Sequence, residues 1–353
     1  MRESALTLHS AVAAMIREQR SKMNDSAVKI VKTDSSSGTW QEAQEKALWA
    51  PAAKALGIAY AKDSYQGWAD ARKQIEAGSV TLDIIQISLI EEPQAKAAGV
   101  LEKLDEDVFN PADFVPGSYT DYFVPNSIYS TLIAWNRNTY GGSGPSSRAD
   151  FWDVDRFPGK RALWNEPSGM IEAAVLALGT PREQVYEFLS TEEGRKAAID
   201  KLAGLAPHVS VWWESGAEAV QLMTAGAVDM ILTWGGRIQE ATDGGANFAY
   251  SFVDGQLGTD GYAVVRGAPH RDAAMRLLKE MSKPEYHKDL PCYFSTALAN
   301  VKAYDLAGFS PEKLATMASA PQNVAVQYAA DPDWWSRYGA WASEAYAKVR
   351  LSR

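Results

Sequence analysis

The chain has 353 residues, of which 46% are hydrophobic, and it carries a formal net charge of -9 with a pI near 5.1. This length predicts two domains, because domains typically hold roughly 100 to 200 residues, and the apolar share is sufficient for two cores. The acidic balance argues against a nucleic-acid-binding surface and favours cationic over anionic solutes. Cys292 is the only cysteine, so no intramolecular disulfide can form. The cysteine content therefore fits both a reducing cytosol and a periplasmic protein without disulfides.

No stretch of the chain approaches the roughly 20 apolar residues of a membrane-spanning helix. Residues 5–16 have the length of the hydrophobic region of a short signal peptide. Glu3 and His9 weaken that pattern, and residues 17–22 are strongly polar. We interpret residues 1–26 as an N-terminal extension, either an extra helix or a start-site artefact. A degenerate signal peptide is the alternative.

The first third of the chain alternates between strand and helix patterns. A strand is expected at 27–33, followed by the loop Asp34-Ser-Ser-Ser-Gly38, and Thr39 with Glu42 matches a capping box for the next helix. The next expected elements are a strand at 58–61, a helix at 67–78 that ends at glycine, and a strand at 82–87. Ser88 follows this last strand and is a candidate cleft residue.

The rest of the chain continues the alternation after an irregular aromatic segment at 109–125. Strands are expected at 130–136, 161–164, 228–233 and 258–265, and helices at 170–178, 182–190, 192–202, 217–224 and 271–281. Such alternation predicts a mainly parallel sheet that is covered by helices on both faces. There is no repeat and no long linker, so interleaved lobes fit better than consecutive domains.

Two strand-to-helix loops carry a tryptophan near their tips, Trp40 in the first half and Trp234 in the second. Loops of this kind line ligand crevices in open α/β sheets, so the two could face each other across a cleft. The alternative is that each ring only closes the edge of its own core.

Familiar catalytic and metal-binding motifs are missing from the sequence. The four histidines are scattered, and there is no HExxH pair, no Cys/His cluster, no GxGxxG, no GxxxxGK[ST] and no GxSxG. The adjacent acids Glu91 and Glu92, and Asp153 with Asp155, are interpreted as solvated faces. We therefore expect neither an enzyme, nor a metal site, nor a cofactor.

The remaining candidates form a set suited to holding a ligand. They lie at or near the predicted ends of elements: Trp40, Ser88, Trp234, Asp260, Tyr293 and Trp335. Aromatic faces around a carboxylate suit a cation, since a ring face attracts positive charge by about 0.5 to 2 kcal/mol. Each has a structural alternative: Trp335 could cap the terminal helices, and Ser88 could satisfy a strand-end amide. Trp212 and Trp213 are assigned to packing.

Several blocks of sequence resemble the periplasmic solute-binding proteins of ABC importers, specifically the spermidine/putrescine-binding group. The blocks are Gly38-Thr-Trp-Gln-Glu-Ala-Gln44, Lys62-Asp-Ser-Tyr-Gln-Gly67, the segment 75–85, Phe151-Trp-Asp-Val-Asp-Arg-Phe-Pro-Gly-Lys-Arg161, Val211-Trp-Trp-Glu-Ser-Gly-Ala217, Asp254-Gly-Gln256 and Asp331-Pro-Asp-Trp-Trp335. They follow the family order over roughly residues 27 to 350.

The resemblance implies an α/β protein with the two-lobed periplasmic-binding-protein fold of type II, with mixed, mostly parallel sheets and a hinge. We expect lobe 1 to hold residues 27–133 and 260–300, and lobe 2 to hold 134–259 and 301–353. The implied partners are a small-molecule ligand and the transmembrane permease subunits of an ABC transporter. The implied location is the periplasm, and a monomer is expected.

The resemblance also assigns roles to individual residues. Asp260 matches the acid that grips an amino group, Trp40, Trp234 and Tyr293 match aromatic walls, and Ser88 matches a polar residue after the third strand. At three positions the chain departs from polyamine binders. Gly258 and Ile90 stand where those proteins commonly carry an aromatic ring. Glu166 matches the first acid of their acidic pair, whereas Gly169 stands at the position of the second. A long polyamine needs an acid at each end, because an unpaired buried charge is expensive.

We expect a non-enzymatic protein that captures a small cationic solute, a polyamine such as putrescine or spermidine, with Asp260 as the anchor. One alternative is an amino-acid-like or anionic solute, held by the amide groups of the loop 35–38 around Ser37 at a helix N-terminus. The other alternative is an enzyme built on the same two-lobed scaffold. The sequence does not name the ligand or the permease.

Overall fold

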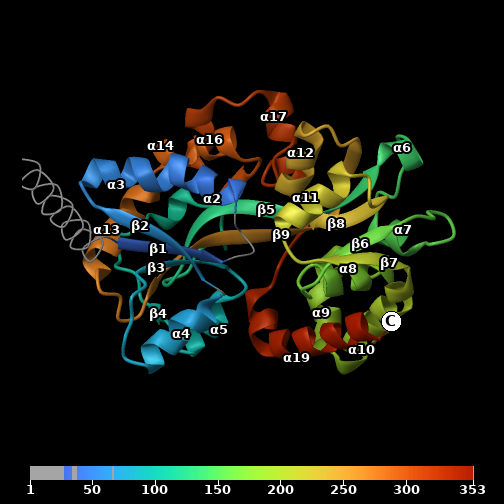
Figure 1. Ribbon diagram of the computed structural model, residues 1–353, viewed down its shortest axis with the longest axis horizontal. Coiled ribbons are helices and arrows are strands. Elements are labelled where there is room, and N and C mark those ends of the chain that lie inside the picture. Colours follow the sequence, from blue (N-terminus) through green and yellow to red (C-terminus); the bar gives the residue numbers. More distant parts are fainter. Residues whose placement is uncertain (1–27, 34–37, 66, 353) are drawn as a thin grey trace, which may run out of the picture.

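Two α/β lobes share one 11-stranded sheet (Figure 1). The computed structural model describes residues 28–33, 38–65 and 67–352. Along the sheet the strands follow the order β2-β1-β3-β9-β5-β8-β6-β7. The first lobe contains β1 (Val28–Thr33), β2 (Tyr60–Tyr65), β3 (Ile84–Ser88) and β4 (Leu101–Glu102), and the second contains β6 (Arg161–Trp164), β7 (Val209–Trp213) and β8 (Met230–Trp234).

Two long antiparallel strands, β5 (Val124–Asn136) and β9 (Phe248–Val265), run through both lobes and join them. β3 pairs with the end of β9 and β8 pairs with the end of β5, in both cases antiparallel. The outer strands of each lobe pair in parallel: β1 with β2 and β3, and β6 with β7 and β8. The sheet is therefore mixed, and its antiparallel centre forms the connection between the lobes.

The sequence patterns found only parts of the two connecting strands. The expected strands at 130–136 and 258–265 are the distal halves of β5 and β9, which begin at Val124 and Phe248. Pro125 and the pair Gly255 and Gly258 resemble turn residues, and proline and glycine are rare inside central strands. Register shifts between Pro125 and Ser127 and between Thr131 and Ile133 accommodate this irregular sequence.

Helices cover both faces of the first lobe. They are α2 (Thr39–Gln44), the π-helical turn η2 (Glu45–Trp49), α3 (Ala50–Leu56), α4 (Trp68–Glu76), α5 (Glu92–Ala97), α13 (Arg271–Met281), α14 (Pro284–His287), α15 (Leu290–Tyr293) and α16 (Lys302–Ala307). The capping box expected at Thr39 is wrong. Gly38 is the N-cap residue and provides no side-chain hydrogen bond. Thr39 is therefore the first helical residue, and its hydroxyl donates to Glu240 instead of capping the helix.

The second lobe carries the longer helices. They are α6 (Arg137–Tyr140), α7 (Arg148–Trp152), α8 (Met170–Ala177), η4 (Arg182–Gln184), α9 (Val185–Ser190), α10 (Glu192–Leu205), η5 (Ala206–His208), α11 (Gly216–Thr224), α12 (Gly235–Asp243) and α19 (Pro332–Leu351). Short elements lie around the connection: η3 (Pro111–Asp113), β10 (Ala297–Leu298), α17 (Pro311–Ala315), α18 (Pro321–Val324) and β11 (Tyr328–Ala329). Within the described part of the chain, no helix is both long and apolar enough to cross a membrane.

The C-terminal segment divides between the lobes instead of belonging to one. Ala303 of α16 is buried in the core of the first lobe, together with Trp49 and Leu278. α19 packs into the core of the second lobe through Trp334, Trp335 and further buried residues. Residues 301–353 therefore contribute to both cores, first through α16 and then through α19 (Figure 1).

Candidate functional site

A cavity of about 570 Å³ lies between the two lobes. The first lobe and the connecting strands contribute residues of α2, β3, β5 and β9, and the second lobe contributes the loop after β6, the start of α12 and part of α19. The volume lies in the range of pockets that enclose a small-molecule ligand, which is roughly 300 to 1,000 Å³. The cavity is the candidate ligand site.

Asp260 supplies an acidic group to this cavity from strand β9. It lies opposite Ser88 of β3 and Ser127 of β5 in the sheet register, and all three residues line the cavity. Burial, and after it the negative charge of Glu91, raises the pKa of Asp260 to about 7. Burial therefore favours the protonated form of this carboxyl group, and a cation bound beside it would favour the charged form.

Tyr129 of β5 stands beside this acid and fills the space above Gly258. A Cβ atom at Gly258 would lie 2.3 Å from the Tyr129 ring, so only glycine accommodates the ring in this position. Burial, followed by the charge of Asp260, raises the pKa of the Tyr129 hydroxyl. The aromatic ring that polyamine binders carry two residues before the acid is thus replaced by a ring from the neighbouring strand.

The adjacent acids Glu91 and Glu92 point in different directions. Glu91 lines the cavity, and its Oε2 accepts a hydrogen bond from the Ser88 amide at 2.8 Å. Glu92 is buried away from the cavity and accepts a hydrogen bond from the Thr120 hydroxyl at 3.1 Å. The expectation that both acids form a solvated face is wrong, since Glu91 belongs to the cavity wall and burial raises its pKa.

Tryptophans form the wall of the second lobe. Trp164 and Trp234 line the cavity, and their ring centroids lie 5.1 Å apart in an edge-to-face arrangement. Trp213 lies behind them, fully buried, with its ring stacked on Trp164 at 5.7 Å and its Nε1 donating to the Leu232 carbonyl oxygen at 3.2 Å. The interpretation of Trp213 as a packing residue is confirmed. Its ring supports the rings of Trp164 and Trp234, which line the cavity.

A cation from the second lobe meets the first lobe at one end of the cavity. Arg237, only 5% exposed, lies in the first turn of α12 and donates from Nη1 to Thr39 Oγ1 at 3.0 Å and to Glu240 Oε2 at 2.7 Å. Its guanidinium group packs over the Phe294 ring at 5.1 Å. The Trp40 ring contacts the same Phe294 at 5.2 Å, and its Nε1 has no hydrogen-bond partner among the described residues.

Trp335 closes the cavity from α19 and connects both lobes. Its ring lines the cavity, and its Nε1 donates to the buried Glu172 Oε1 at 3.1 Å. Its backbone carbonyl oxygen accepts a hydrogen bond from Gln94 Nε2 of the first lobe at 2.9 Å. The two roles considered for this residue, packing of the terminal helix and contact with the cavity, are thus both present.

The structure brings most of the expected site residues together. Those that line the cavity are Trp40, Ser88, Glu166, Trp234, Asp260 and Trp335. Tyr293 is not among the lining residues; it is 49% exposed and its neighbour Phe294 faces the cavity instead. Ser37 lies outside the described residues. Cavity residues that sequence patterns missed are Glu91, Tyr129, Trp164, Arg237 and Phe294.

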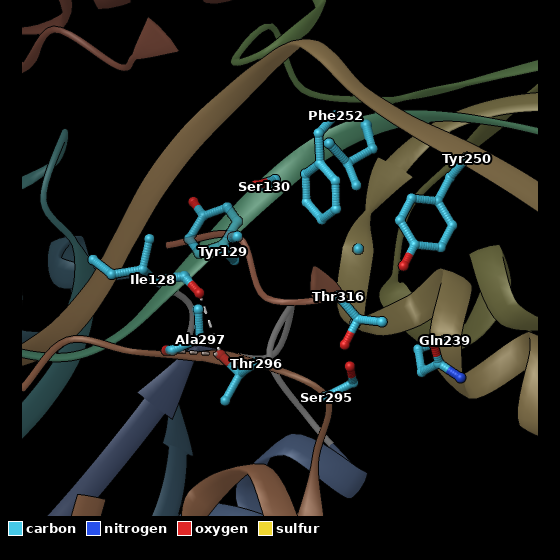
Figure 2. Close-up of a pocket in the computed structure, with 14 residues that line it drawn as sticks. Ile128, Tyr129, Ser130, Gln239, Tyr250, Phe252, Ser295, Thr296, Ala297 and Thr316 are labelled. Atoms are coloured by element: carbon cyan, nitrogen blue, oxygen red, sulfur yellow. Dashed lines mark hydrogen bonds between the residues drawn. The ribbon is translucent and has the colours of Figure 1, made fainter. Parts of the chain in front are cut away.

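A second, much smaller cavity lies beside the connecting strands and is too small for a solute. Its volume of about 30 Å³ suits water molecules, and it is lined by Tyr129 and Ser130 of β5, by Tyr250 and Phe252 of β9, and by Thr296 (Figure 2). The Thr296 hydroxyl donates to the Ile128 carbonyl oxygen at 3.4 Å. Among the described residues, no group of three or more His, Cys, Asp and Glu side chains is arranged to hold a metal ion.

Comparison with known proteins places this geometry in a family. The family model described as bacterial extracellular solute-binding protein matches residues 56–291, more than half of the chain. The chain belongs to the bacterial extracellular solute-binding proteins. As in its homologues, this solute-binding protein is the substrate-binding component of an ABC transporter and not an enzyme. Family membership implies a periplasmic location, while residues 1–27 lie outside the described residues.

Two relatives are named for, or were solved with, small molecules. The solute-binding protein MotA of A. tumefaciens B6, solved in complex with glucopine, is 71% identical; the match covers 92% of this chain and 100% of MotA, with a TM-score of 0.88. The gamma-aminobutyric acid-binding protein of Pseudomonas aeruginosa is 31% identical over 318 residues, which are 87% of this chain and 89% of that protein.

The spermidine/putrescine group is only a distant relative of this solute-binding protein. The binding protein PotD of Streptococcus pneumoniae is 15% identical, with a TM-score of 0.70 and 92% of this chain covered, which is a likeness of fold alone. The family expected from the sequence blocks is therefore confirmed at the level of solute-binding proteins. The narrower assignment to polyamine binders is not supported by the more similar proteins.

Proposed function

We propose that this protein captures a zwitterionic opine of the glucopine type in the periplasm and delivers it to an ABC permease. The observation that carries the proposal is the 71% identity to a protein solved with glucopine, together with a cavity that combines acids, one arginine and aromatic walls. Glucopine joins the nitrogen of an amino acid to a sugar-derived polyol. It presents one ammonium group, one carboxylate and several hydroxyl groups.

The acidic wall suits the ammonium group of such a ligand. The carboxylates of Asp260 and Glu91 repel each other when both are charged. An ammonium group bound between them offsets this repulsion. A charge-assisted hydrogen bond to a carboxylate is roughly twice as strong as a neutral one. We assign the ammonium group to Asp260, with Glu91 as the second acid.

The part of the cavity wall formed by Arg237 and Trp40 suits the carboxylate. Arg237 is buried, and both of its hydrogen bonds to residues that the structure describes use Nη1, so Nη2 is the donor that we assign to the ligand. Trp40 Nε1, which has no hydrogen-bond partner within the described ranges, is the second donor that we assign to this wall. This pair replaces the Ser37 loop as the basis for an amino-acid-like ligand. The aromatic faces of Trp164 and Trp234 are the surface assigned to the polyol chain.

A polyamine remains the second candidate, because four acids, Asp260, Glu91, Glu166 and Glu214, line the cavity. Each could meet one ammonium group. The buried Arg237 opposes this candidate, since a cationic ligand without a carboxylate would leave the guanidinium group facing like charge.

Isothermal titration calorimetry with glucopine, gamma-aminobutyric acid, putrescine and spermidine tests the proposal. We expect glucopine to bind most tightly, gamma-aminobutyric acid more weakly because it lacks the polyol, and the two polyamines weakest. Tighter binding of putrescine or spermidine than of glucopine, by about tenfold or 1.4 kcal/mol, would overturn the opine assignment in favour of a polyamine. Absence of binding by all four would refute both.

A further inference from the structure

Glu172 is a fully buried carboxylate next to the cavity, although it does not line it. It lies in the first turn of α8. Three side-chain donors converge on its Oε1: the Tyr186 hydroxyl at 2.8 Å, Gln256 Nε2 at 2.9 Å and Trp335 Nε1 at 3.1 Å. Its Oε2 accepts from the Gly169 amide at 2.9 Å. A carboxylate with this many donors holds all of them in one arrangement.

Three of the four donors, all except the Tyr186 hydroxyl, come from the cavity wall, the cavity loop or the strand that joins the lobes. Trp335 is a cavity wall, and Gly169 ends the loop 165–168 whose residues line the cavity. Gln256 lies on β9, the strand that joins the lobes, opposite Thr131 of β5. Trp335 is also the residue whose carbonyl oxygen meets Gln94 of the first lobe. One buried group therefore connects the cavity wall, the cavity loop and the connection between the lobes.

We propose that Glu172 is a positioning residue for ligand binding, which fixes the Trp335 ring and the loop 165–169 against strand β9. Ligand binding then depends on a residue that never touches the ligand. This inference rests on the proposed function for the choice of ligand, but the positioning itself does not depend on which solute is bound.

The geometry predicts how a conservative substitution acts. In Glu172→Gln the amide oxygen keeps the Oε1 position, because three donors converge there, and the NH₂ group then faces the Gly169 amide donor. This variant loses the bond to the loop and keeps the bond to Trp335. Trp335→Phe does the opposite, because it removes the Nε1 donor and leaves a ring in the wall. Tyr186→Phe removes one donor to Glu172 that contacts no part of the cavity.

Two measurements on the full chain test the proposal. The first is the dissociation constant for glucopine at a temperature where every variant is folded. We expect it to rise about tenfold in Glu172→Gln and in Trp335→Phe, and by less than about threefold in Tyr186→Phe. Glu187→Gln, an exposed acid on the neighbouring α9, is the matched control and should bind like the wild type.

The second measurement is hydrogen–deuterium exchange of the ligand-free protein. Exchange at the Gly169 amide should be faster in Glu172→Gln, while residues 172–177 of α8 keep their protection. A residue that only stabilises the fold would lower the melting temperature and leave the dissociation constant of the folded protein unchanged. That result, or unchanged exchange at Gly169, overturns the proposal. If the wild type binds neither glucopine nor gamma-aminobutyric acid, the proposed function fails, and the exchange result alone supports or overturns the positioning role.

Discussion

Thr39 of the first lobe and Arg237 of the second lobe are hydrogen-bonded to each other, with 3.0 Å between Oγ1 and Nη1. The Thr39 hydroxyl in turn donates to Glu240 Oε1 at 3.3 Å, so one side chain of α2 meets both members of an ion pair on α12. On the other side of the cavity, Gln94 and Trp335 make the corresponding contact between the lobes. Both contacts lie at the rim of the candidate site and hold the lobes together around it.

Removal of the Thr39 hydroxyl should weaken the contact between the lobes. Thr39→Val keeps the shape of the side chain and removes the hydroxyl that accepts from Arg237 and donates to Glu240. We expect glucopine to dissociate at least about threefold faster, because each hydrogen bond contributes about 0.5 to 1.5 kcal/mol. Stopped-flow measurement of the dissociation rate checks this. Thr224→Val is the control, since its hydroxyl bonds only within its own helix. Equal rates in Thr39→Val and the wild type would show that this contact does not slow the release of the ligand.

Asp260→Asn should abolish most of the affinity for an amine ligand. Truncating one partner of a buried charge pair costs about 2 to 5 kcal/mol, so we expect a loss of roughly 100-fold or more in glucopine affinity. Calorimetry measures the loss, with the exposed Asp305→Asn as a control of equal charge change. An unchanged dissociation constant would remove Asp260 from the ammonium site.

The stability of the ligand-free protein should depend on pH through Asp260. Its pKa is raised from 3.8 to about 7 in the folded protein, so the folded state binds the proton more tightly than the unfolded state. The stabilising contribution is fully present below about pH 4 and is lost as the pH rises through about 7. We expect the melting temperature of Asp260→Asn, relative to the wild type, to increase between pH 4 and pH 8. A constant difference over this range would contradict the raised pKa.

Gly258→Ala should disturb the acidic wall through Tyr129. The new methyl group would lie 2.3 Å from the Tyr129 ring, and a clash of this kind in a packed region costs about 1 to 3 kcal/mol of unfolding free energy. Chemical denaturation measures this loss. In the control Gly204→Ala nothing lies within 4 Å of the new methyl group, and helix propensity should stabilise the protein by up to about 1 kcal/mol. Addition of Tyr129→Ala should relieve part of the loss in Gly258→Ala.

Much of the local structure followed from the sequence. The strands β3, β6 and β8 and the helices α8, α10, α11 and α13 lie within a few residues of their expected positions, because alternation and helical periodicity are properties of neighbouring residues. Ser88 and Asp260 were found for the same reason, since each stands in a strand whose apolar pattern is clear. β5 and β9 were found only in part, because their proline and glycines are tolerated by pairing with distant strands.

The direction of individual side chains could not be predicted in the same way. Glu91 faces the cavity while Glu92 is buried away from it, and Phe294 lines the cavity while Tyr293 does not. Two neighbouring residues of similar chemistry cannot be told apart by the sequence pattern. The packing of α5 and α15 against other elements decides which residue of each pair faces the cavity. The ring beside Asp260 likewise comes from Tyr129, about 130 residues earlier in the chain.

The sequence by itself determined the alternation of strands and helices, the family of solute-binding proteins and a cleft with Asp260 and several tryptophans. Only the tertiary structure decided which acids share the cavity, that Arg237 lines the same cavity and that Glu172 accepts a hydrogen bond from Trp335. The physical reason is the range of the forces involved. Hydrogen-bonding pattern and apolar periodicity act within a few residues, whereas the charge balance of a cavity arises from side chains that packing brings together from both lobes.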